Sequence, residues 1–256
     1  VGMISNQILQ NTIEGLKGIT RIDLCVMDID GKVLASTFPE NGDYENAVLS
    51  FVASPADSQV IQGYQFFKIF DEHQLEYILL ANGGNDDVYM IGKIAAFQIQ
   101  NLLVAYKERF DKDNFIKNLL LDNLLLVDIY NRAKKLHIDT DVRRVIFIIE
   151  TSHDKDTNAL DNVRTLFGGK TRDFITAVDE KNIIVVKELS AGEGYAEMEK
   201  VAEEMLSMLK SEGEEGAHIA YGTIVSDIKE VSKSYKEAKL ALDVGKIFFE
   251  EKDIVA

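Results

Sequence analysis

Cysteine and proline are scarce in this 256-residue chain. The single cysteine, Cys25, lies in the apolar run IDLCVMD, so an internal disulfide is excluded and a reducing compartment is indicated. The two prolines are Pro39 and Pro55, and no proline interrupts an element after residue 55. Short, stiff connections between elements are therefore favoured over a flexible tether.

Long apolar runs and targeting signals are also missing. No stretch reaches the roughly 18 uninterrupted apolar residues that a membrane span requires. The amino terminus, VGMISNQ, has no basic region followed by an apolar core, so it does not resemble a secretory signal. We expect a cytoplasmic protein with no membrane partner.

Positive charge is in the minority, with 28 Lys and Arg against 43 Asp and Glu and a net charge of −15. A chain of this charge repels phosphate backbones at long range, so it is not expected to bind nucleic acid by itself. The acidic surface can equally serve solubility alone.

Patterns for metal binding and nucleophilic catalysis are absent from the sequence. A metal site needs converging His, Cys or carboxylate ligands, and the four histidines have no paired spacing. No nucleophile lies in a recognisable elbow, so a Ser-His-Asp triad cannot be inferred. We therefore predict no catalytic residue, no metal and no cofactor. The histidines are His73, His137, His153 and His218.

Residues 3–110 show the order helix, hairpin, helix, hairpin, long helix. Apolar spacing predicts the helices, and β-rich runs around the turns Asp30-Gly31 and Glu72-His73-Gln74 predict the two hairpins. This order is typical of PAS-like and GAF-like sensor domains. The predicted helices cover residues 4–17, 44–54 and 86–110, and Ser5 or Asn6 can cap the first.

Residues 111–140 continue the helical spacing and are predicted to form a helical relay. The segment FIKNLLLDNLLLVDIYNRAKKLHID leads directly into the buried strand RRVIFIIE. From there, residues 141–256 show the order strand, helix, two paired strands, helix, strand, helix. This is a ferredoxin-like plan, so the whole chain is predicted to be α+β with two domains.

These segments resemble the CdaR/PucR (sugar diacid regulator) family of bacterial transcription regulators. FIKNLLLDNLLLVDIYNRAKKLHID with RRVIFIIE resembles the beginning of that family's GGDEF-like domain, and YGTIVSDIKEVSKSYKEAKLALDVGKIF resembles its end. The resemblance covers residues 111–256 well and residues 3–110 more loosely. It implies a PAS-like sensor domain, a GGDEF-like domain, and a carboxy-terminal helix-turn-helix domain. Since this chain ends at EEKDIVA, DNA is expected to be bound only through a domain outside it.

The resemblance also bears on catalysis. Active diguanylate cyclases carry Gly-Gly-Asp/Glu-Glu-Phe at the turn between the second and third strands, where glycines allow close approach of the nucleotide. This chain has Ala177-Val178-Asp179-Glu180-Lys181 there. Asp154 or Asp156 lies near the position of the cyclases' metal-binding aspartate, but the surrounding pattern is missing. The resemblance therefore implies a domain that is not an enzyme, with Asp179 and Glu180 as ordinary hairpin-tip residues.

A ligand pocket is expected in the first domain, for a small carboxylate or sugar acid as the small-molecule effector. Such a ligand needs cations and hydroxyls to replace water around each carboxylate. The predicted ligand-binding residues are Arg21, Lys68, Tyr64 and Tyr77. The alternatives are a solvated strand lysine for Lys68 and core packing for the aromatic residues. The family's Arg- and His-bearing stretch after the second strand is replaced by STFPENGDYENAV, which puts the diacid in doubt.

The long helix at 86–110 permits two interpretations. Its apolar stripe either packs on its own sheet or extends into a parallel coiled coil with a second chain, and we expect a homodimer. The predicted function is ligand sensing and signal relay in a bacterial transcriptional regulator. The alternatives are a degenerate nucleotide-cyclase-like enzyme or nucleotide-binding module, and a dimerisation scaffold with a vestigial pocket.

Overall fold

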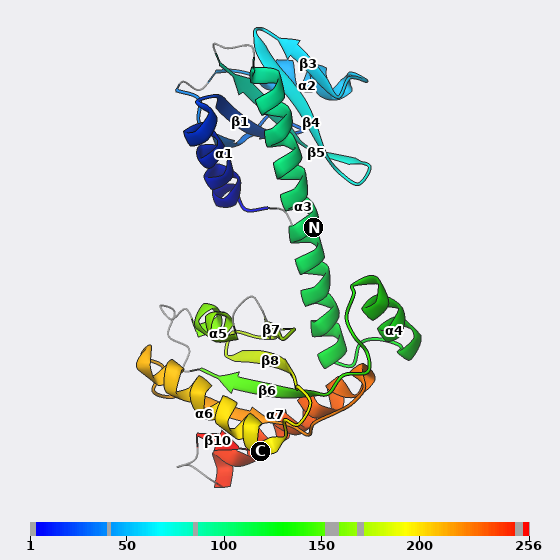
Figure 1. Cartoon of the computed structure of the whole chain (residues 1–256), viewed down its shortest axis with the longest axis vertical. Helices are drawn as coiled ribbons and strands as arrows, with labels where there is room; N and C mark the ends of the chain where they lie inside the picture. Colours follow the sequence, from blue (N-terminus) through cyan, green and yellow to red (C-terminus); the bar gives the residue numbers. More distant parts are fainter. Residues whose placement is uncertain are drawn as a thin grey trace. The chain divides into compact units, whose positions relative to one another are not determined.

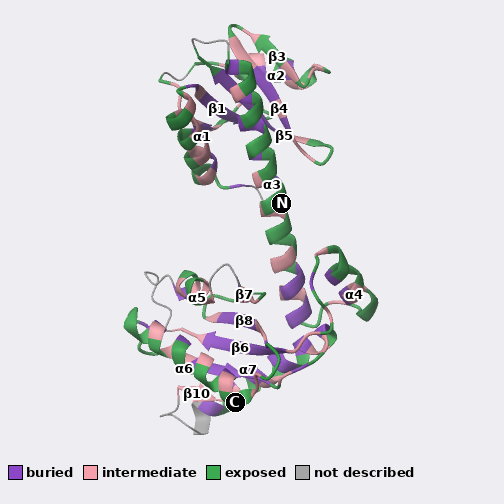
Figure 2. Ribbon diagram, in the orientation of Figure 1, coloured by how far each residue is buried: buried purple, intermediate pink, exposed green. Residues whose placement is uncertain are grey.

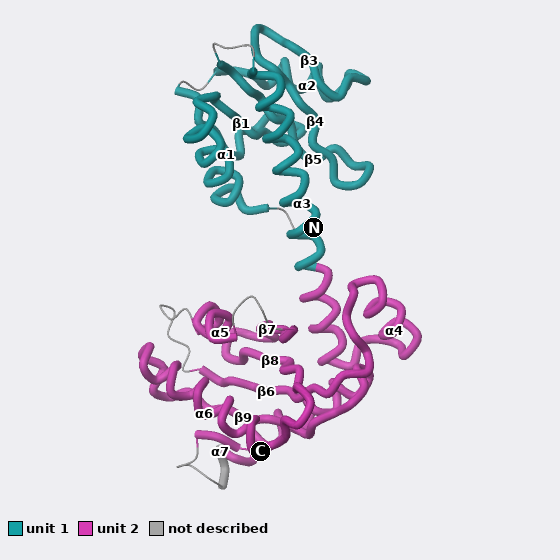
Figure 3. Tube along the Cα trace, in the orientation of Figure 1, with its two compact units in different colours: residues 1–110 teal, residues 111–256 magenta. Residues whose placement is uncertain are grey.

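In the computed structural model the chain divides into two compact units, residues 1–110 and residues 111–256 (Figure 3). The structure describes residues 4–39, 42–83, 87–151, 159–167, 172–248 and 253–255, without the side chains of 246–248. Both units are α+β, as predicted, and each has its own five-stranded sheet (Figure 1).

Unit 1 is an antiparallel sheet of strand order β2-β1-β5-β4-β3 with helices on both faces. Its element order is the one predicted for a PAS/GAF-like sensor domain, with β3 as an additional edge strand. Its elements are α1 (Asn6–Thr20), β1 (Asp23–Asp28), β2 (Val33–Ser36), α2 (Glu45–Ala53), β3 (Ser58–Ile61), β4 (Tyr64–Asp71), β5 (Gln74–Asn82) and α3 (Val88–Leu120).

The first hairpin turn is fixed by local chemistry. The Asp28 carboxylate accepts hydrogen bonds from the backbone N–H groups of Asp30 and Lys32, at 3.1 and 2.8 Å. Gly31 has a φ of +86°, and a Cβ there would lie 2.9 Å from the Cα of Glu45. Only glycine meets both demands, which explains the Asp-Gly signal in the sequence.

The strands of unit 1 are largely buried (Figure 2), and its core has two clusters on opposite faces of the sheet. Helices α1 and α3 cover one face, where Leu79 of β5 is fully buried, and α2 covers the other, where Leu80 is fully buried. Alternate residues of a strand point to opposite faces, so β5 needs apolar side chains at every position. This explains its continuous run YILLA.

Helix α3 continues ten residues beyond its predicted end at Phe110 and stops at Leu120. No proline or glycine lies between these residues, so nothing in the backbone ends the helix earlier. Its last turns belong to unit 2, where Phe115 and Leu119 are buried with exposed fractions of 1% and 2%. Part of the segment predicted to be a relay is therefore core of unit 2.

Length and composition alone would also allow α3 to cross a membrane. Its most apolar window has a mean hydropathy of 1.3, and 33% of that window is buried. The core helix of a globular unit meets the same criteria, and Ala95, Ile99 and Leu103 of α3 lie in the core of unit 1. We therefore interpret α3 as a core helix.

Unit 2 contains the predicted ferredoxin-like sheet, with β9-β6-β8-β7 antiparallel and β10 added in parallel at the β9 edge. Helices α5 and α6 pack on one face, and α4, α7 and the end of α3 pack on the other. The elements are α4 (Leu126–Lys135), β6 (Arg144–Glu150), α5 (Ala159–Phe167), β7 (Phe174–Ala177), β8 (Asn182–Glu188), α6 (Tyr195–Ser211), β9 (His218–Tyr221), the 3₁₀ turn η1 (Ile228–Glu230), α7 (Val231–Phe248) and β10 (Ile254–Val255).

Candidate functional site

Lys68 and Tyr64 lie on the face of β4 that packs against α2. Lys68 is on the face opposite Phe67 and Ile69, because alternate residues of a strand point to opposite faces. Its ammonium group donates hydrogen bonds to the carbonyl oxygens of Ser54 and Val52 at the end of α2, and lies 5.1 Å from the centre of the Phe51 ring. Lys68 therefore links the end of α2 to β4 through hydrogen bonds instead of extending into solvent.

Tyr64 belongs to an aromatic cluster with Phe38 and Tyr44. Its ring centre lies 5.2 Å from that of Tyr44 and 5.5 Å from that of Phe38, and the Tyr44 hydroxyl donates a hydrogen bond to the Tyr64 hydroxyl at 3.2 Å. The Tyr44–Tyr64 contact is edge-to-face, and such pairs stabilise a core beyond the area they bury. All three rings are half-buried.

Tyr77 lies on the other face of the sheet, with an exposed fraction of 2%. It packs in the cluster that α1 and α3 cover. Burial raises the pKa of Tyr77, the charge of Glu76 raises it further, and the nearby backbone of Ile4 opposes the increase. The structure therefore does not bring Tyr77 together with Lys68 and Tyr64.

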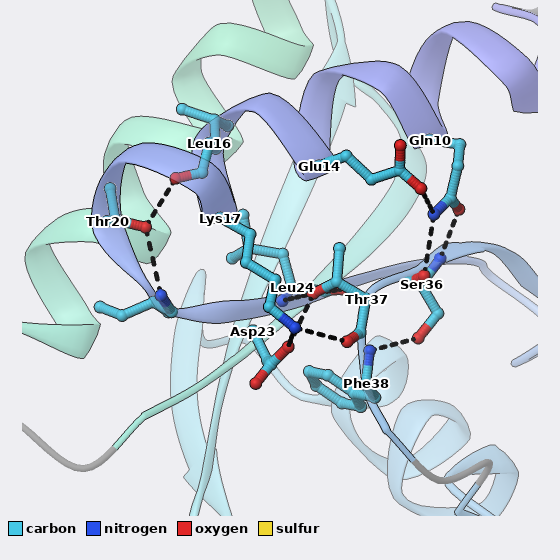
Figure 4. A network of polar contacts seen from close by, with 11 residues as sticks. Gln10, Glu14, Leu16, Lys17, Thr20, Asp23, Leu24, Ser36, Thr37 and Phe38 are labelled. Carbon is cyan, nitrogen blue, oxygen red and sulfur yellow. Dashed lines mark hydrogen bonds and ion pairs between the residues drawn. The ribbon is translucent and has the colours of Figure 1, made fainter.

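Arg21 follows α1 in the left-handed conformation, with a φ of +60°. It lines a surface cleft of about 590 Å³ together with Glu14, Lys17, Gly18 and Thr37. The polar network beneath it fixes Lys17, which pairs with Asp23 at 2.6 Å and donates to the Thr37 carbonyl at 3.2 Å (Figure 4). None of the other three predicted residues lines this cleft. A ligand-binding role for the four residues stays a prediction.

A second pocket, of about 380 Å³, lies in unit 2 where the start of β6, the end of β8 and the start of β7 meet. Strand pairing brings together three of the segments that line it: Arg144 of β6 lies opposite Glu188 of β8, and β7 pairs with β8 from Phe174 onward. We call it the Arg144 pocket. It is lined by Lys112, His137, Ile138, Asp139, Arg144, Arg172, Asp173, Phe174 and Glu188.

Arg144 is the most unusual residue of this pocket, because its exposed fraction is only 2%. Its Nη2 atom donates a hydrogen bond to the Asp139 carbonyl at 2.6 Å, whereas Nη1 is buried and has no hydrogen-bond partner among the described residues. Burial lowers the pKa of Arg144, and the charge of Glu188 opposes that effect. A buried cation with an unused donor is costly, and an anion would offset that cost.

The rim of the pocket carries a second guanidinium. Arg172 lies 2.9 Å from the Asp139 carboxylate and 3.7 Å from that of Glu188, and its side chain is 71% exposed. The Asp173 carboxylate is only 1% exposed, accepts a hydrogen bond from the Glu188 backbone at 2.8 Å and pairs with Lys187 at 3.4 Å. The Asp173 carboxylate therefore interacts with residues of β8. The exposed Arg172 can leave the carboxylates of Asp139 and Glu188 to bind an anion.

The turn that corresponds to the cyclase motif has another role here. The Asp179 carboxylate accepts hydrogen bonds from the Lys181 and Asn182 backbones and from the Asn182 side chain, at 2.8 to 2.9 Å. Desolvation alone would raise the pKa of Asp179, but these hydrogen bonds, led by the Asn182 side chain, lower it overall. Asp179 therefore closes the β7–β8 turn. Asp154 and Asp156 lie outside the described residues, and among those described no group of His, Cys, Asp and Glu forms a candidate metal site.

Sequence reasoning missed Arg144, Arg172 and Phe174. The available signal was the pair Arg143-Arg144 immediately before the apolar run VIFIIE, since a strand buried on both faces rarely starts with a charge. The pairing that brings Arg172 and Phe174 beside Arg144 is long-range and leaves no local pattern.

Comparison with known families identifies the second unit. Residues 123–244 match the model of the GGDEF-like domain, so unit 2 contains a GGDEF-like domain and follows the α+β unit 1. Membership of the CdaR/PucR family is not shown by the comparisons. No curated protein matches the chain.

Solved structures of PelD from Pseudomonas aeruginosa are similar to this chain at low identity. PelD 156-455 from strain PA14 in the apo form has 12% identity and a TM-score of 0.31, over 89% of this chain and 84% of that one. PelD 158-CT from strain PAO1 has 12% identity and a TM-score of 0.32, over 97% and 90%. PelD 156-455 in complex with c-di-GMP has 13% identity and a TM-score of 0.31, over 97% and 89%. Similarity at this level carries no functional argument.

Proposed function

We propose that the GGDEF-like domain binds a phosphate-bearing nucleotide in the Arg144 pocket and serves as a ligand-binding module, not as a nucleotide cyclase. The observation that carries this proposal is the buried guanidinium of Arg144, whose Nη1 donor has no partner among the described residues. The volume of about 380 Å³ is within the range of small-molecule sites.

The other lining residues have the chemistry that a nucleotide needs. Guanidinium groups bind phosphate through two parallel hydrogen bonds, and Arg172 and Lys112 add positive charge to that of Arg144. Phe174 offers an aromatic face on which a base can stack. The carboxylates of Asp139 and Glu188 can accept hydrogen bonds from the N–H groups of a base. Inorganic phosphate or a plain dicarboxylate would use only part of this set.

Two features support binding without cyclisation. Ala177 and Val178 occupy the positions of the two glycines that let a cyclase backbone approach its substrate. The Asp179 carboxylate is already engaged by three donors within its own turn. Incubation with GTP and Mg²⁺ is expected to yield no cyclic dinucleotide, and product formation would contradict this part of the proposal.

Isothermal titration calorimetry tests the site. Cyclic di-GMP, the ligand of one of the PelD structures, and GTP are titrated into the protein beside inorganic phosphate and a small dicarboxylate. Arg172→Gln should weaken nucleotide binding roughly tenfold, because a charge-assisted hydrogen bond is lost. Arg164→Gln makes the same charge change on α5, outside the pocket, and should leave binding unchanged. Absence of binding by both nucleotides, or equal effects of the two variants, would contradict the proposal.

A second candidate function is sensing of a small carboxylate by unit 1, with transcription regulation as its output through a DNA-binding domain elsewhere. It is favoured by Arg21, which lines an open surface cleft together with Lys17. Heat released with a dicarboxylate that disappears in Arg21→Gln but persists in Arg172→Gln would support it. Equal heats in wild type and Arg21→Gln would exclude this cleft.

A further inference from the structure

Helix α3 carries an exposed apolar stripe that the rest of unit 1 does not cover. Met90, Ile94, Phe97 and Val104 have exposed fractions of 62%, 53%, 66% and 56%. The opposite face of the same helix is buried in the core of unit 1, so the stripe is not the core-facing side (Figure 2). Contiguous exposed apolar side chains of this size mark interaction surfaces.

The spacing of the stripe is that of a coiled-coil seam. Its positions are 90, 94, 97, 101 and 104, which alternate steps of four and three residues, the a/d pattern of a heptad. Asn101, which is exposed, occupies an a position in this pattern. A single asparagine at an a position fixes register and favours pairing of two like helices, because each amide can both donate to and accept from its counterpart.

Charge also favours a second copy of the chain as the occupant. Between Tyr89 and Tyr106 the only charged residue is Lys93, although the whole chain carries −15. Two copies can therefore approach along this segment without the repulsion expected elsewhere on their surfaces. A membrane surface fits less well, because interfacial helices have a polar face rich in Lys and Arg, whereas the reverse face of α3 is protein core.

We propose that the chain forms a parallel homodimer in which the α3 stripes of two copies pack together and Asn101 faces Asn101. An antiparallel arrangement centred on Phe97 would place Asn101 near the level of Ile94 of the other copy, where its amide would be buried without a partner. The seam ends at the next a position, Glu108, in the charged run KERF. This inference does not depend on the nucleotide site.

Light scattering coupled to size-exclusion chromatography tests the dimer on the full chain. The wild type should show twice the mass of one chain, and Phe97→Glu should halve it while its circular dichroism spectrum stays unchanged. Ile19→Glu places the same charge on α1, at a side chain that is 83% exposed, and should remain dimeric. A monomeric wild type across the micromolar range would overturn the proposal, whether or not it co-sediments with phosphatidylcholine/phosphatidylserine vesicles. So would a Phe97→Glu variant that is folded and dimeric.

Cross-linking tests the parallel register. Asn101→Cys should form an intermolecular disulfide under mild oxidation, because identical a positions meet across a parallel seam. Cys25 is buried and does not compete. Gln98→Cys, on the same helix but outside the seam, is the control and should cross-link much more slowly. Equal rates for the two variants, or no cross-link through Asn101→Cys, would overturn the parallel arrangement.

Discussion

Arg144 and Cys25 are both buried, but burial leaves Arg144 charged and keeps the Cys25 thiol neutral. Arg144 keeps its charge because guanidinium cannot be deprotonated in a protein, so burial turns it into a site that attracts an anion. Cys25 is 1% exposed in unit 1, and burial raises the pKa of its thiol to about 11, despite a hydrogen bond with Ser36 that lowers it. The thiol therefore stays protonated and serves as a small apolar core residue.

Cys25 should react slowly with a thiol reagent in the native protein at pH 8 and rapidly in denaturant. The thiolate is the reactive form, and both its scarcity and its burial protect it. Because its pKa is raised on folding from 9.0 to about 11, the associated stability is present below pH 9 and is lost as the pH rises toward 11. Colour development with Ellman's reagent, with and without guanidinium chloride, measures the reaction rate of the thiol. Equal rates in the two conditions would contradict it.

Gly222→Ala should destabilise unit 2 by about 3 kcal/mol, at the upper end of the cost of overpacking a core. A Cβ at this position would lie 2.1 Å from the Ser234 carbonyl oxygen, so β9 and α7 would have to separate. Gly194→Ala is the matched control, since its Cβ meets only the Glu197 carboxylate at 3.7 Å. Chemical denaturation followed by circular dichroism measures both variants, and similar midpoints would refute the close approach.

At the scale of elements, α3 is the feature that the sequence predicted in kind but not in extent. Its apolar spacing predicts a helix that ends at Phe110, but the observed helix ends at Leu120. The predicted end is wrong because Phe115 and Leu119 are buried in unit 2, which extends the helix. Helix α6, at Tyr195–Ser211, is the second helix that the order of elements in residues 141–256 predicts. Strands β3 and β10 are only four and two residues long, too short for a periodic pattern, and they depend on a neighbouring strand for their existence.

Phe115→Ala should cost about 3–5 kcal/mol of unfolding free energy, because a fully buried ring leaves a cavity in the core of unit 2. Phe110→Ala, on the same helix but 45% exposed, should cost under about 1 kcal/mol. Urea denaturation of the two variants compares the same chemical change at a buried and an exposed site. A small effect of Phe115→Ala would show that this part of α3 is a linker and not core.

At the scale of the whole molecule, strand pairing explains why the fold was predictable and the Arg144 pocket was not. The order of elements in residues 141–256 predicts a ferredoxin-like plan, and the GGDEF-like match agrees with it. The pocket needs Arg144, Arg172 and Glu188 at one sheet edge, which depends on pairings between residues up to 44 positions apart. Hydrophobic periodicity carries no information about such neighbours.

The division into two units also separates the proposed roles. Unit 1 contains the exposed α3 stripe and the cleft at Arg21, and unit 2 contains the Arg144 pocket. A ligand that binds only unit 2 should raise the unfolding midpoint of that unit by mass action, with no direct contribution to unit 1. Differential scanning calorimetry with and without cyclic di-GMP checks this, and stabilisation of unit 1 alone would place the ligand elsewhere.

The most direct test of nucleotide binding at the Arg144 pocket is a titration of isotope-labelled protein with cyclic di-GMP, followed by backbone amide chemical shifts. We predict saturable changes that are largest at the amides of Asp139, Arg144, Phe174 and Glu188, and small changes in unit 1. Changes confined to unit 1 or to the turn at Asp179–Asn182, or no change at all, would contradict the account.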